Sequence, residues 1–191
     1  MKKTFIYAVI LGLFSIPFVS NAEPIHFKID TVHSGISFKV RHLVSNTPGD
    51  FTAFTGSVVF DEENSTNNSA EATIQVSSID TRNEKRDGHL RGDDFFNEAE
   101  FPAITFKSSN WEKVDDKNYK VTGNLSFAGQ THPVTLDVFY LGQYDNNGTL
   151  VGGWEGTIII KRSEWGMTYG VPAVGDEVEI ELNIAGEYKT E

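Results

Sequence analysis

Apolar and polar residues alternate along much of the chain, which is the pattern of β-strands that bury one face. The clearest run is 177–184, where four aliphatic residues alternate with three glutamates and an asparagine. The same alternation recurs in the segments 25–29, 36–40, 54–60, 72–76, 104–106, 119–127, 134–140 and 154–160. These are about nine strand candidates separated by turn signals, which indicates a β-sandwich or a β-barrel.

Several connections between the strand candidates have recognisable turn chemistry. The sequence Asp-Asn-Asn-Gly at 145–148 can supply residues with positive φ, and Ala-Gly-Gln at 128–130 is a second short turn. Segment 61–69 is polar and has no apolar anchor. Segment 42–51 contains Pro48 and Gly49, and we expect it to be irregular and to cap one end of the fold.

One polar stretch, 81–97, does not show the β alternation. Thr81 and Glu84 have the spacing of a capping box, which predicts the start of a helix. Gly88 and Gly92 lie inside the stretch, and each weakens a helix by about 1 kcal/mol. We therefore expect one or two short helical turns that end before Pro102 and lie across one end of the fold.

Residues 1–22 have the organisation of a secretory signal peptide. Lys2 and Lys3 precede an uncharged, mostly apolar run over 4–19, and Ser-Asn-Ala at 20–22 offers small residues for cleavage after Ala22. The alternative is a membrane anchor, but the apolar run is shorter than the ~20 residues that span a bilayer. We expect an exported protein whose mature part, residues 23–191, forms a single domain.

The composition narrows the possible partners. The chain has 27 acidic and 16 basic residues, a formal net charge of −11. Such a charge favours solubility and disfavours contact with nucleic acid or with anionic lipid surfaces. We expect no nucleic acid partner and no stable membrane insertion. The absence of cysteine excludes disulfides and cysteine-based catalysis or metal binding.

The candidates for catalysis are weak. His33 and Ser34 are adjacent, but neighbouring residues of a strand point to opposite faces, so they are not expected to form a base and nucleophile. Arg86, Asp87 and His89 place a donor, an acceptor and a titratable group within one helical turn. They could hold an anionic head group or form a structural network, and the sequence leaves both readings open.

Metal binding is not indicated either. The five histidines, at positions 26, 33, 42, 89 and 132, lack the paired spacing of a metal motif. Segment 145–148 resembles the start of a calcium loop, but the twelfth position is Gly156 and not the glutamate that such a loop requires. We expect neither a metal nor a cofactor.

Large apolar side chains are concentrated near strand ends and irregular segments: Phe51, Phe54, Phe95, Phe96, Phe101, Phe106, Phe127, Trp165, Met167 and Tyr169. For any one residue an ordinary packed core is the simpler explanation. Together they exceed what a filled small barrel needs, and long apolar ligand pockets are lined in this way.

The ordered motifs of the chain resemble the YceI-like family. The matching blocks are Ile29-Asp30, His33-Ser34, Phe38-x-Val40-Arg41-His42-Leu43, Gly49-x-Phe51-x-x-Phe54-x-Gly56, Ser78-Ile79-Asp80-Thr81, Arg86-Asp87-x-His89-Leu90, Asp94-Phe95-Phe96, Phe101-Pro102-x-Ile104-x-Phe106, Gly123-x-Leu125, Gly129-x-Thr131-x-x-Val134-x-Leu136, Arg162-Ser163-x-Trp165-Gly166-Met167 and Val174-Gly175-Asp176-x-Val178. They run through nearly the whole mature chain. Trp165 departs from the pattern, which more often has phenylalanine there.

The resemblance implies an all-β fold, a single extended antiparallel eight-stranded lipocalin-like barrel with one or two short helical segments. It also implies a periplasmic protein, linked in some members to pH stress, that holds a polyisoprenoid, quinone or fatty-chain lipid and is not an enzyme. The chain of the ligand would contact Phe38, Val40, Phe51, Phe54, Phe95, Phe96, Phe106, Phe127, Trp165 and Met167. Its head group would meet a polar cluster drawn from His33, Arg41, His42, Arg86, Asp87 and His89.

Two other functions remain open from the sequence. One is an enzyme that acts on a hydrophobic substrate with histidine and aspartate as acid and base. The other is a stress-response interaction protein whose barrel is simply filled. A homodimer is also compatible with the sequence.

Overall fold

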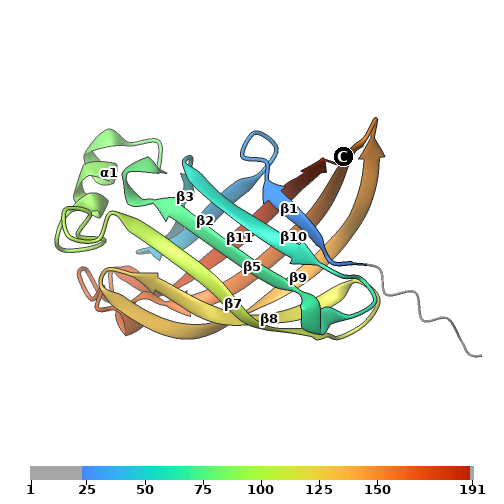
Figure 1. Ribbon diagram of the computed structural model, residues 1–191. Helices are drawn as coiled ribbons and strands as arrows, with labels where there is room; N and C mark the ends of the chain where they lie inside the picture. Colours follow the sequence, from blue (N-terminus) through green and yellow to red (C-terminus); the bar gives the residue numbers. More distant parts are fainter. Residues whose placement is uncertain (1–22, 190–191) are drawn as a thin grey trace, which may run out of the picture.

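The computed structural model describes residues 23–189, so the predicted signal peptide lies outside the described residues. The chain is almost entirely β-structure (Figure 1). Its strands are β1 (Ile25–Ile29), β2 (Gly35–His42), β3 (Ser45–Phe51), β4 (Phe54–Phe60), β5 (Ser69–Gln75), β6 (Ile79–Asp80), β7 (Ala103–Lys113), β8 (Asn118–Phe127), β9 (Gln130–Asn146), β10 (Thr149–Lys161) and β11 (Val174–Lys189). The described residues also form one α-helix, α1 (Glu84–Arg91), and three 3₁₀ turns, η1 (Ser65–Asn67), η2 (Val76–Ser78) and η3 (Arg162–Trp165).

Eight of the strands close into an antiparallel barrel in the order β1-β4-β5-β7-β8-β9-β10-β11. The ring closes where β11 returns to β1, pairing Lys28 with Glu187 and Ile29 with Gly186. The remaining strands, β2, β3 and β6, extend the sheet from the first half of β11. The predicted eight-stranded lipocalin-like barrel is therefore confirmed.

The alternation in 177–184 has the predicted orientation. Val178, Ile180 and Leu182 face the barrel interior, while the glutamates between them face outward. On that outer face Lys39 of β2 forms ion pairs with Glu179 and Glu181, at 2.8 and 3.5 Å. The polar side of the strand thus pairs across the sheet, and the apolar side lines the interior.

Both predicted hairpin turns are present. Ala128 and Gly129, between β8 and β9, have φ of 47° and 74°. Asn147 and Gly148, between β9 and β10, have φ of 53° and 88°. Positive φ at both central positions matches the right-handed twist of the flanking strands.

The prediction of an irregular segment over 42–51 was wrong, because β3 occupies most of it. Pro48 pairs with Lys39 of β2, and on its other side β6 pairs only with Asp50 and Phe51. The missing N–H of Pro48 therefore faces an unpaired edge, where proline is tolerated. Gly49 is required by contact, since a Cβ there would lie 2.3 Å from the ring of Phe38.

The predicted capping box was also wrong, although the helix exists. The N-cap of α1 is Asn83, whose side chain accepts a hydrogen bond from the N–H of Arg86 at 3.0 Å. Thr81 instead donates its N–H and its hydroxyl to the buried carboxylate of Asp87, at 2.9 and 2.5 Å. These bonds fix α1 over one end of the barrel, on the left in Figure 1.

Within residues 23–189, no helix has the length and apolar character needed to cross a bilayer.

Candidate ligand-binding cavity

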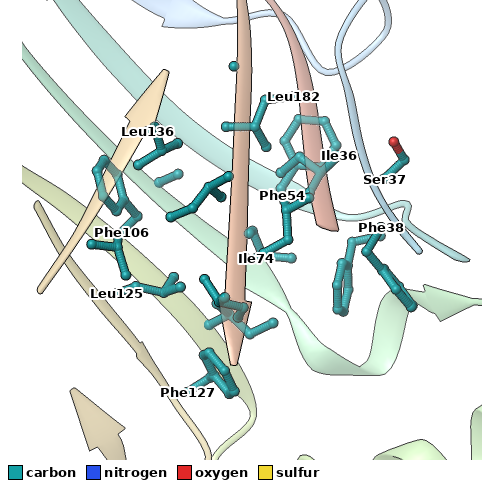
Figure 2. Close-up of a pocket in the computed structure, with 18 of the residues that line it drawn as sticks. Ile36, Ser37, Phe38, Phe54, Ile74, Phe106, Leu125, Phe127, Leu136 and Leu182 are labelled. Atoms are coloured by element: carbon teal, nitrogen blue, oxygen red, sulfur yellow. The ribbon is translucent and has the colours of Figure 1, made fainter. Parts of the chain in front are cut away.

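The barrel encloses a cavity of about 240 Å³. It is larger than an engineered apolar cavity of roughly 150 Å³ that stays dry and binds benzene. Side chains from strands on all sides of the barrel line it, and Figure 2 shows Ile74, Phe106, Leu125, Leu136 and Leu182 among them. The space is therefore formed by the inward faces of the alternating strands.

Many of the inward side chains are only partly buried. Val134 of β9, Ile158 of β10 and Val178 of β11 all line the cavity and yet retain accessible surface. Phe38 and Phe106 behave in the same way. Aliphatic and aromatic residues that point inward and remain accessible face an unfilled space. The interior therefore contains unfilled apolar space and is not packed like a closed core.

Polar residues contribute little to the wall. Ser37 lies at the edge of the site in Figure 2, and its hydroxyl donates to the carbonyl of Glu181 at 3.5 Å. Ser57, Glu71, Glu155 and Arg162 are the other residues of the lining with polar side chains. A ligand in this cavity would therefore meet an almost wholly apolar surface.

Arg162 is the buried charge of the site, with 4% of its surface exposed. Its guanidinium donates to four backbone carbonyls, at distances of 2.7–3.1 Å: those of Met167, Tyr169, Val174 and Gly175. Burial lowers the pKa of Arg162, which nevertheless stays protonated in proteins, and the nearby Asp176 opposes that shift. Arg162 thus fixes the segment between η3 and β11 to the barrel wall.

Trp165 supports the wall from behind. Its ring stacks on Phe127, with centroids 4.8 Å apart and planes 11° from parallel. Its indole N–H donates to the carbonyl of Leu125 at 3.1 Å. Because both Phe127 and Leu125 line the cavity, Trp165 holds two lining residues in place without lining the space itself.

An aromatic cluster fills the end of the barrel opposite α1. It consists of Phe27, Phe60, Trp111, Tyr119, Tyr140 and Trp154, all buried. Phe60 is at its centre, with ring centroids 4.5 Å from Tyr140 and 5.5 Å from Trp154. Burial raises the pKa of Tyr140 to about 12, so the phenol stays neutral. Trp111 and Trp154 form the floor of the cavity, and the other rings lie behind them.

The structure brings most of the predicted apolar ligand contacts together. Apart from Trp165, all of them line the one cavity: Phe38, Val40, Phe51, Phe54, Phe95, Phe96, Phe106, Phe127 and Met167.

The six predicted polar residues lie in three separate places, and none is in the cavity wall. His33 is in the β1–β2 loop and Arg41 and His42 are at the end of β2, whereas Arg86, Asp87 and His89 are on α1.

Five of the six polar residues, all but His42, have side-chain partners outside the predicted cluster. Arg86 donates to the hydroxyl and the carbonyl of Thr81, at 2.7 and 2.6 Å. His89 is 3.0 Å from the carboxylate of Asp94 and packs edge-on against Phe95. These contacts are those of the structural network that the sequence left open as one reading of 86–89.

His33 and Ser34 do not bond to one another in the described structure. The Nδ1 of His33 lies 2.5 Å from the carboxylate of Asp30, while Ser34 bonds the backbone of Ala185. The hydrogen bond that His33 donates to Asp30 raises the pKa of His33, and the same bond lowers the pKa of Asp30. The His33–Asp30 bond and the bonds of Ser34 to Ala185 therefore stabilise the exposed β1–β2 loop.

Sequence reasoning missed much of the wall, because it selected aromatic residues. The missed lining residues include a large aliphatic set: Ile29, Ile36, Val58, Ile74, Ile79, Leu90, Ile104, Val121, Leu125, Val134, Leu136, Val138, Ile158, Ile160, Val174, Val178, Ile180, Leu182 and Ile184. Almost all belong to the alternating runs, so the signal that could have found them was the inward face itself. Among residues 23–189, no group of three or more potential metal ligands converges.

A closed antiparallel barrel with an apolar interior defines the class of lipocalin-like barrel proteins. The sequence profile of the YceI-like domain matches residues 27–186. A UPF0312 protein of Pseudomonas aeruginosa (strain LESB58) is 35% identical, over 97% of this chain and 98% of its own. The chain therefore belongs to the YceI-like family.

Solved structures agree with this assignment. BcnA of Burkholderia cenocepacia is 29% identical and has a TM-score of 0.74, over 82% of this chain and 98% of its own. A domain from Saccharophagus degradans has a TM-score of 0.67 at 14% identity, over 85% of this chain and 98% of its own. That domain, described as a polyisoprenoid binding domain implicated in plant cell wall breakdown, supports the fold alone.

Proposed function

We propose that this protein is a periplasmic binding or carrier protein that holds a long-chain isoprenoid or a similar amphiphilic lipid inside its barrel. The observation that carries the proposal is the cavity of about 240 Å³ whose inward aliphatic wall remains partly accessible. The polyisoprenoid binding described for the Saccharophagus degradans domain is consistent with this ligand class.

The energetics favour an apolar ligand. Each Å² of apolar surface removed from water contributes about 25 cal/mol, so a prenyl or acyl chain gains affinity along its whole length. A polar ligand would lose its hydration and find few partners, because the wall is almost wholly apolar.

Binding is better supported than catalysis. His33, His42 and His89, the histidines among the predicted site residues, are all outside the cavity wall. A general base has to reach the proton it abstracts, and these side chains do not line the space where a substrate would sit. The third candidate, a filled barrel that serves only for protein interactions, is disfavoured by the cavity itself.

Native mass spectrometry of the protein purified from its own periplasm tests the proposal. We expect a stoichiometric adduct that organic extraction identifies as a long-chain amphiphile. A mass without adduct, unchanged after quinones and prenyl lipids are offered, would contradict the proposal.

A matched pair of variants on β10 shows whether the ligand is in the barrel. Ile158 lines the cavity, whereas its neighbour Ile159 points outward with 63% of its surface exposed. We expect Ile158→Trp to fill the cavity and remove the adduct, and Ile159→Trp to retain it. Equal retention by two folded variants would place the ligand elsewhere.

A further inference from the structure

The turn between β2 and β3 consists of two exposed apolar residues, Leu43 and Val44. Val44 has the exposure of an isolated residue, 101%, and Leu43 is 56% exposed. Leu43 also has φ of 53°, a backbone conformation that residues other than glycine adopt rarely. Two-residue hairpin turns usually contain glycine, asparagine or aspartate. Folding and solubility alone would favour glycine, asparagine or aspartate at these two positions. The apolar side chains therefore indicate that the turn contacts another apolar surface.

The loop that precedes β11 continues this apolar surface. The N–H of Leu43 donates to the carbonyl of Ala173 at 2.7 Å, which fixes the turn against the loop. Within the loop, Tyr169 and Val171 are 48% and 50% exposed. We refer to Leu43, Val44, Tyr169 and Val171 together as the apolar rim.

The rim lies directly beside the cavity wall. Val40, three residues before Leu43, lines the cavity, as does Val174, which follows Ala173. The ring of Tyr169 packs against that of Phe95, another lining residue, with centroids 5.4 Å apart. In Figure 1 the loop lies at the same end of the barrel as α1. Since the aromatic cluster fills the opposite end, the rim borders the end of the barrel that α1 covers.

The two chain segments that carry the rim lack carboxylates of their own, and the nearest acidic groups, Asp176, Glu177 and Glu179, share a surface pocket with Arg41. The chain has a net charge of −11, yet the segments 41–49 and 165–175 contain no carboxylate. Arg41, next to the turn, is exposed and donates to the carbonyl of Leu43 at 2.8 Å. An apolar tip with a flanking arginine suits a lipid surface, where apolar side chains enter the acyl boundary and the cation stays among the head groups.

We propose that the apolar rim docks on the surface of a lipid bilayer, so that the cavity takes up or delivers its ligand directly at the membrane. This inference rests on the proposed lipid-binding function. Docking is reversible, because only the tips of two loops enter the interface and the remaining surface is acidic.

Flotation with phosphatidylcholine vesicles that contain no ligand tests docking separately from ligand binding. Leu43→Gly combined with Val44→Ser removes the apolar tip and relieves the positive φ, so the variant is expected to fold. We expect its vesicle partitioning to be about tenfold weaker, because the buried apolar area of two side chains is lost. The matched control is Val114→Ser combined with Tyr144→Ser, which removes two exposed apolar residues outside the rim and should leave partitioning unchanged.

Uptake of a long-chain prenyl quinone completes the test. We expect the Leu43→Gly, Val44→Ser variant to load the quinone normally from cyclodextrin and several-fold more slowly from vesicles. A wild-type protein that loads from cyclodextrin and does not float with vesicles would overturn docking and leave the proposed function standing. A dimer in sedimentation that the same variant dissociates would also overturn it, by assigning the rim to a second copy of the chain.

Discussion

The carboxylate of Asp176 accepts two hydrogen bonds from Ser163, one from its backbone N–H at 2.9 Å and one from its hydroxyl at 2.8 Å. This pair joins the start of β11 to η3. It therefore fixes the segment that carries Arg162 and the loop of the apolar rim.

The Asp176 pair predicts an acid-dependent loss of stability. The bonds from Ser163, aided by the charges of Arg162 and Lys161, hold the pKa of Asp176 below its usual value. A lowered folded pKa gives stability that is complete above the unfolded pKa, about 3.9, and is lost as pH falls through the folded value. We expect thermal unfolding of Asp176→Asn to depend less on pH in that acidic range than the wild type does.

Asp30, Asp61 and Asp115 also have lowered pKa values, so the slope should decrease and not vanish. Parallel melting curves for the variant and the wild type across the acidic range would show that Asp176 contributes nothing.

Arg162 should be more sensitive to substitution than an ordinary interior cation. Lysine preserves the charge, but its single ammonium cannot fan out over the four carbonyls that Arg162 reaches. We expect Arg162→Lys to lower the free energy of unfolding by about 2–4 kcal/mol, measured by urea denaturation. A loss within error would mean that the loop before β11 is held by other contacts.

Two glycines offer a matched test of barrel packing. A Cβ on Gly123 would lie 2.5 Å from the carbonyl of Lys107 and 2.6 Å from the ring of Phe106, whereas one on Gly35 would meet nothing within 4 Å. We expect Gly123→Ala to cost about 2 kcal/mol of folding free energy and Gly35→Ala to stay within about 0.5 kcal/mol. Similar unfolding curves for the two variants would contradict the close packing at Gly123.

Arg86 should prove structural and not ligand-binding. It is outside the cavity wall and donates to the hydroxyl and carbonyl of Thr81. We expect Arg86→Ala to lower the melting temperature by several degrees, because buried acceptors lose a charged donor. Its affinity for a prenyl quinone, measured by fluorescence titration on the folded fraction, should not change. A tenfold loss of affinity would instead show that Arg86 contacts the head group of the ligand.

The fold could be predicted well from sequence because strand periodicity is local. The run 177–184 fixed which residues face inward before any partner strand was known. Segment 42–51 could not be assigned in this way. Pro48 and Gly49 are usually turn residues, and only the partners of β3 show why a strand tolerates them: an unpaired edge beside Pro48 and the ring of Phe38 over Gly49.

The apolar part of the candidate site could be predicted from sequence, and the polar part could not. The lining phenylalanines were found through their type and their motifs, whereas the polar residues were grouped because they are close in sequence or chemically similar. Whether His33 and His89 lie near one another depends on how the β1–β2 loop and α1 dock, and neither is set by local pattern. Asp30 and Asp94, their actual partners, lie within five residues of them.

The closure of the barrel has a consequence for the order of folding. The ring is completed only when Ile29 pairs with Gly186, two residues near opposite ends of the described chain. A chain synthesised from its N-terminus can form the sequential hairpins from β7 to β11 locally, but β1 has no closing partner until β11 exists. Such a non-local step makes folding slow relative to hairpin formation. Until it occurs, the apolar wall has no interior to face, so the nascent barrel depends on protection from aggregation for as long as β11 is missing.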